Sequence, residues 1–169
     1  RFAFPILDGL RIGPHPEEAW YFHPRWCGLL NDAPADLVSI YGQYVRMQVM
    51  AAYHPSASVT GKPAGIYIVT RDTTMRRKTY ELVKHVRGVV PMKLRDEYGF
   101  PSWFGFRTQD GIGMAVNWLR LSLRANQALR VPPVVLGLGA CDWRDALASY
   151  GRWARTWCPL HDRVARDCF

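Results

Sequence analysis

The alternation of strand-like and helix-like segments between residues 65 and 138 constrains the fold most. Four short runs are rich in β-branched and aromatic residues, which is typical of strands: GIYIVTR (65–71), VVPMKLR (89–95), SWFGFRT (102–108) and VVLGL (134–138). Helical periodicity and capping residues predict a helix over 75–86 and another over 112–129. The resulting order is strand, helix, strand, strand, helix, strand. It predicts a ferredoxin-like βαββαβ core with a four-stranded antiparallel sheet and two helices on one face.

The flanking segments add further regions to this core. Asp36 can cap an extra N-terminal helix over 37–53, which is apolar around most of its circumference. Asp142 can cap a C-terminal amphipathic helix. We therefore expect an α+β protein with four regions: an extended arm rich in proline and aromatic residues (1–35), a helix and loop (36–63), the core (64–139), and the C-terminal helix and tail (140–169).

The charge distribution indicates an anionic partner. The formal net charge of the 169 residues is +8. Residues 71–95 hold eight Lys or Arg against Asp72 and Glu81. A basic stretch of this kind is typical of proteins that bind RNA or DNA or contact an acidic membrane surface; a solvated helix face is the alternative. The sequence has no apolar run near the ~20 residues that a transmembrane helix needs, so no transmembrane segment is predicted.

The segment from Ile66 to Leu138 resembles the RNA-recognition motif. Its first predicted strand has the aliphatic–aromatic–aliphatic order of that family at Ile66, Tyr67 and Ile68, whereas Thr70 and Arg71 depart from the pattern. Phe104, Gly105 and Phe106 match the centre of the family's third-strand motif; the departures there are Ser102, Trp103, Arg107 and Gln109. The resemblance implies an open sheet face on which aromatic side chains stack on RNA bases.

Two registers are open for the aromatic strand 102–108. The family's register places Phe104 and Phe106 on the open face and Arg107 among the helices. The opposite register buries both phenylalanines and exposes Trp103 and Arg107, and it avoids a buried guanidinium that needs a partner. We favour the second register. An extra helix could also cover the open face. The candidate partner-binding residues are Tyr67, Arg71, Arg76, Arg77, Lys78, Lys93, Arg95, Trp103 and Arg107.

Cysteine and histidine residues form no complete metal-site or catalytic motif in the sequence. His23 and Cys27 form one potential zinc-binding pair, and Cys158 and His161 form another at the opposite end of the chain. Free cysteines are the expected state. No nucleophile and base, and no pair of carboxylates, has a diagnostic spacing. We therefore predict a non-enzymatic protein without a cofactor.

These features lead to one main functional hypothesis and two alternatives. The main hypothesis is a structural subunit of a large organellar assembly that contacts other subunits. Within this class, the features favour an RNA-binding component of a mitochondrial ribosome or other ribonucleoprotein. The first alternative is an accessory, supernumerary subunit of a mitochondrial respiratory-chain or ATP-synthase complex that acts through protein–protein contacts. The second is a small metal- or ligand-binding protein. Arg1 in place of Met fits either removal of an import presequence, and hence a mitochondrial location, or trimming of the sequence.

Overall fold

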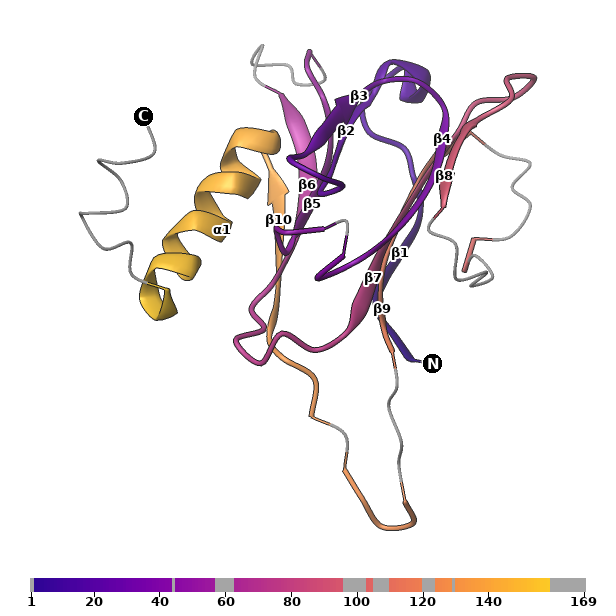
Figure 1. The fold of residues 1–169 in the computed structure, drawn as a ribbon. Coiled ribbons are helices and arrows are strands. Elements are labelled where there is room, and N and C mark those ends of the chain that lie inside the picture. The colour runs from indigo at the N-terminus through magenta and orange to yellow at the C-terminus, as the bar shows by residue number, and fades with distance from the viewer. Residues whose placement is uncertain are drawn as a thin grey trace.

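The chain forms two five-stranded β-sheets and a single α-helix, seen in a computed structural model (Figure 1). The structure describes residues 2–43, 45–56, 63–95, 103–104, 110–119, 124–128 and 130–158. Its elements are β1 (Phe2–Leu10), a 3-10 turn (Pro16–Glu18), β2 (Trp20–His23), β3 (Leu29–Asn31), β4 (Ala35–Ile40), β5 (Val49–His54), β6 (Ala64–Thr70), β7 (Lys78–His85), β8 (Met92–Arg95), β9 (Gly111–Trp118), β10 (Val134–Gly139) and α1 (Trp143–Trp157).

The two sheets pack face to face as a sandwich. Sheet I has the strand order β1-β9-β7-β4-β8, and sheet II has the order β10-β6-β5-β2-β3. All strand pairs are antiparallel except β4 with β8. Buried side chains of both sheets form one apolar cluster between them, including Leu37, Leu82 and Met114 from sheet I and Tyr21, Met50 and Ile68 from sheet II. Each such aliphatic or Met side chain contributes about 1.5–3 kcal/mol when it leaves water.

Helix α1 covers the outer face of sheet II (Figure 1). It begins with a capping box, in which the Asp142 carboxylate accepts from the Arg144 N–H at 2.6 Å and the Asp145 carboxylate accepts from the Asp142 N–H at 2.9 Å. Beneath the helix, Phe22 and Val69 join a second apolar cluster. This helix lies where the sequence predicts one.

The predicted α+β ferredoxin-like fold is wrong, because three predicted helices are strands. The range 37–53 holds most of β4 and β5, joined by a turn in which Gly42 has a φ of 89°. The range 75–86 holds β7, and 112–129 begins with β9. Every residue of β9, and all of β7 except His85, is buried. A strand covered on both faces does not show the polar–apolar alternation of a half-exposed strand, so its apolar run is easily taken for a helix.

Residues 1–35 are also part of the sandwich. They supply β1 to sheet I and β2 and β3 to sheet II. The proposed separation of an arm from a core at 64–139 therefore does not describe the fold, since β1 pairs with β9 and β2 pairs with β5.

The outer face of sheet I is covered at its centre and does not form the open stacking surface expected from the sequence. Phe104 is buried there against Val83 and Ala115. The Trp103 N–H donates to the buried Glu81 carboxylate at 3.0 Å. Trp103 and Phe104 lie outside the strands; the rest of the predicted strand 102–108 is outside the described residues.

Candidate functional site

Four loops lie together at one end of the sandwich, which we call the basic loop end. They are 24–28, 71–77 and the described parts of 41–48 and 119–133, and they follow β2, β4, β6 and β9. The antiparallel registers place the ends of these strands beside the starts of β5, β7 and β10. Figure 1 shows 71–77 and the described part of 119–133 at the lower end of the sandwich. Three of the predicted partner-binding cations, Arg71, Arg76 and Arg77, therefore lie in a loop and not on a sheet face.

Hydrogen bonds connect loop 71–77 with loop 119–133. The Arg71 N–H donates to the Pro133 carbonyl at 2.8 Å, and the Leu119 N–H donates to the Arg77 carbonyl at 3.0 Å. The Arg76 guanidinium donates to the Arg130 carbonyl at 2.6 Å. These contacts fix the positions of the two loops relative to each other.

Loop 41–48 connects the remaining two loops to this frame. The buried Gln48 side chain donates through Nε2 to the Asp72 carbonyl at 2.9 Å. On the other side, Arg25 and Trp26 both form isolated β-bridges with Val45. The four loops are therefore a continuous surface.

The basic loop end is strongly cationic. Five exposed arginines lie on its described part: Arg46, Arg71, Arg76, Arg124 and Arg130. Arg77 is half-buried. In the described residues of the four loops, Asp72 is the only acidic residue, and it is buried. The described loops at the opposite end carry both signs of charge: the exposed carboxylates of Glu17, Glu18 and Asp32, and the exposed guanidinium groups of Arg11 and Arg87. Positive charge is therefore concentrated at the basic loop end.

Asp72 forms an ion pair with Lys78 just beneath the basic loop end. The Lys78 ammonium donates to the Asp72 carboxylate at 2.6 Å, and both side chains are fully buried. The same carboxylate accepts from the Thr74 N–H, the Thr74 hydroxyl and the Arg76 N–H at 2.6–2.9 Å. Burial raises the pKa of Asp72, but these hydrogen bonds and the Lys78 charge outweigh burial and lower it below its ordinary value.

Two lysines of the basic run 71–95 are consequently unavailable to a partner. Lys78 is one, although the sequence places it among the partner-binding candidates. Lys84 is the other: its buried ammonium donates to the carbonyls of Glu17 at 2.5 Å and Ala19 at 2.7 Å, and to that of Asp32. Both lysines are buried because they lie on the inward face of β7, the face that also carries Leu82.

The other predicted binding residues are scattered over the surface. Tyr67 lies on the outer face of sheet II, against Gly137. Lys93 and Arg95 are on the edge strand β8, where Arg95 donates to both Asp36 carboxylate oxygens at 2.5–2.9 Å. Trp103 is exposed over sheet I, and Arg107 is outside the described residues. The described residues of this group do not lie together with Arg71, Arg76 and Arg77.

The candidate metal ligands do not form a cluster. His23 is buried between the sheets, and its Nε2–H donates to the Tyr80 carbonyl at 3.2 Å. Cys27 is exposed on loop 24–28, Cys158 is exposed after α1, and His161 is outside the described residues. Within the described ranges, no three or more His, Cys, Asp or Glu residues are placed to hold a metal ion. Burial lowers the pKa of His23 to about 4.

A second surface, which we call the edge face, lies where the edge strands β1 and β10 stand at the same side of the sandwich. Large apolar side chains are exposed on both strands: Phe2, Phe4 and Ile6 on β1, and Leu136 and Leu138 on β10. The sequence alone does not predict this surface, because the strand order of the two sheets decides that β1 and β10 are edge strands.

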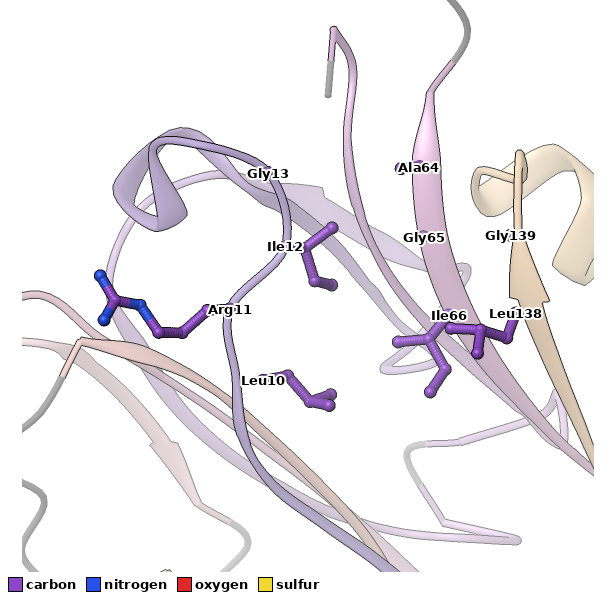
Figure 2. A pocket seen from close by; sticks show the side chains of 9 residues that line it. All are labelled: Leu10, Arg11, Ile12, Gly13, Ala64, Gly65, Ile66, Leu138 and Gly139. Atoms are coloured by element: carbon purple, nitrogen blue, oxygen red, sulfur yellow. The ribbon is translucent and has the colours of Figure 1, made fainter. Parts of the chain in front are cut away.

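A cavity of about 310 Å³ opens between the two strands of the edge face. Figure 2 shows Leu10 and Ile12 on one side of it and Ile66 and Leu138 on the other, with Arg11 pointing away. The space between the sheets is therefore accessible at this side and is lined mainly by apolar groups.

No family model, curated protein or solved structure matches the chain. None of the helices in the described part of the chain has the length and apolar character needed to span a membrane.

Proposed function

We propose that the protein is a non-catalytic module of a larger assembly and that it binds a protein partner through the edge face. The observation that carries this proposal is the exposure of Leu136 and Leu138 on the unpaired edge strand β10, beside the apolar cavity. Scattered exposed apolar residues are ordinary on a protein surface, whereas apolar side chains on an unpaired strand edge favour pairing with another chain. The proposal corresponds to the protein-contact role expected from the sequence; the mitochondrial location stays a prediction.

The chemistry of β10 supports this role. The strand reads VVLGLG and has no lysine, proline or other residue that protects an edge from pairing. Leu136 and Leu138 share a strand face with Ile68 of the core, because they pair with Ile68 and Ile66. They are nevertheless 50% and 84% exposed, since no strand follows β10 in the sheet. A partner that covers this edge would bury both side chains.

The partner would also satisfy the outer backbone groups of β10. Each edge strand presents a row of N–H and C=O groups that pair with water in the isolated domain. An extended segment of a partner protein can replace this water with ladder hydrogen bonds, as in other cases of strand addition. The apolar cavity beside β10 supplies room for side chains that face the core.

We expect the double variant Leu136→Ser/Leu138→Ser to lose its protein partner. Affinity should fall about 30-fold or more, because two leucines are lost and each contributes about 1–3 kcal/mol when it is buried. The melting temperature should change little, because both side chains are already exposed in the isolated domain. Co-purification of the tagged protein from its source cells, quantified by mass spectrometry, measures the loss.

Val90→Ser is the matched control for this experiment. Val90 is 87% exposed but lies between β7 and β8, away from the edge face. Its substitution should leave the recovered partners unchanged. Equal partner recovery for the wild type and the double leucine variant would rule out the edge face as the binding surface.

A further inference from the structure

Trp26 forms an exposed aromatic platform at the basic loop end. Its side chain is 59% exposed, and its backbone has a φ of 53°, in the left-handed region that non-glycine residues rarely adopt. The Arg25 guanidinium lies over the indole at 4.9 Å from the ring centroid. Trp26 is thus an aromatic ring that rests on a cation at one face and is largely open to solvent.

Arg25 is itself held in place. It is 9% exposed, and its NH1 donates to the Ser39 hydroxyl at 2.9 Å. Both Arg25 and Trp26 bridge to Val45, which precedes the exposed Arg46. The indole is therefore positioned by sheet I and by loop 41–48, and a strong cation lies next to it in the chain. A positioned aromatic ring loses little conformational freedom when a ligand stacks on it.

We propose that the basic loop end is a binding site for single-stranded RNA, with Trp26 as the surface on which a base stacks. The positive charge that attracts the phosphate backbone comes from the exposed Arg46, Arg71, Arg76, Arg124 and Arg130. Single-stranded nucleic acid is bound by this combination of a cationic surface and stacked aromatic side chains. The site differs from the open sheet face that the resemblance to the RNA-recognition motif implies, and it uses none of the exposed apolar side chains of the edge face.

The proposal favours a single strand over a duplex because Trp26 needs an accessible base. A duplex presents its phosphates but keeps its bases stacked, so the arginines alone would bind it. An acidic membrane is the competing partner, because it would attract the arginines and take the exposed Trp26 and Met75 into its interface. We commit to RNA because the indole is held against Arg25 with its ring exposed, an arrangement suited to stacking, and the test includes vesicles as the competing outcome.

The test measures binding of a fluorescein-labelled 12-nucleotide oligouridylate to the full chain by fluorescence anisotropy. Binding should weaken steeply from 50 to 200 mM salt, because bound phosphates release counterions. Trp26→Ala should weaken binding between about 5-fold and 100-fold, the range for loss of one stacked base. Trp26→Phe should retain most of the wild-type affinity, since phenylalanine keeps an aromatic face for stacking.

The controls separate stacking from general charge and from folding. Trp103→Ala removes an exposed indole over sheet I and should leave RNA affinity unchanged. Arg71→Ala/Arg124→Ala removes two exposed cations and should lower both the affinity and its dependence on salt. Circular-dichroism melts of all variants check that they remain folded.

Four results would overturn the proposal. They are no binding of the oligonucleotide, equal binding of a 12-base-pair duplex, binding of phosphatidylserine vesicles but not of RNA, and unchanged affinity of a folded Trp26→Ala variant. Leu136→Ser/Leu138→Ser is expected to bind the oligonucleotide like the wild type. Failure of this inference is therefore distinguishable from failure of the edge-face proposal.

Discussion

Replacing Lys78 by methionine is expected to lower the free energy of unfolding by about 3–5 kcal/mol, the usual cost of removing one partner of a buried ion pair. Methionine fills a similar volume but leaves the Asp72 carboxylate without its counter-charge in the interior. The lost ammonium also lies 4.2 Å from the centroid of the Tyr41 ring and 5.2 Å from that of Trp118. Urea denaturation followed by far-UV circular dichroism measures the change.

Two further variants test the origin of this effect. Lys93→Met removes an exposed lysine on β8 and should change stability by less than about 0.5 kcal/mol. Adding Asp72→Asn to Lys78→Met removes the unpaired charge and should recover part of the loss, because an amide oxygen still accepts from Thr74. A loss below about 1 kcal/mol for Lys78→Met would show that the pair is not essential to the interior.

Acidification from pH 7 to pH 4 is expected to cost about 3 kcal/mol of stability through His23 alone. Its pKa is about 4 in the fold, below its ordinary value of 6.5, because burial disfavours the charged ring. Between pH 4 and pH 6.5 the unfolded chain therefore binds more protons than the folded chain. The contribution of neutral His23 is fully present above pH 6.5 and is lost progressively as the pH falls to about 4.

The difference between the wild type and a His23→Gln variant isolates this contribution. Unfolding free energies of both proteins, measured by urea titration at several pH values, should converge as the pH falls through this window. His15→Gln replaces an exposed histidine and should keep the pH dependence of the wild type. If the gap between His23→Gln and the wild type stays constant from pH 7 to pH 4, His23 does not titrate with unfolding.

The elements predicted correctly are those with one clear local signal. The strand at 65–71 corresponds to β6, the strand at 134–138 to β10, and the capped helix after Asp142 to α1. The strands β7 and β9 were predicted as helices because nearly all their side chains are buried. Lys78 and Lys84 added to the error, since charged residues in an apolar run suggest the polar face of an amphipathic helix. Only the tertiary structure shows that carbonyl and carboxylate oxygens surround them.

The candidate sites were predictable only in part. Composition and charge indicate the cations of 71–77, and the structure places them on one loop. Trp26 could not be singled out, because its left-handed backbone and its contact with Arg25 depend on the bridges to Val45. The edge face depends on which strands lie at the edges of the two sheets. Neither feature has a local sequence signature.

The strand order of the sandwich has a consequence for how the chain folds. β1 can pair only with β9, so Leu7 meets Met114 after more than 100 residues of intervening chain. β10 likewise pairs with β6, where Leu136 meets Ile68. Proteins dominated by such distant contacts fold slowly, in milliseconds to seconds, because long loops must close before the contacts form. During synthesis, the first strand must therefore wait for β9 to leave the ribosome, and a nascent chain that ends before residue 111 cannot complete sheet I.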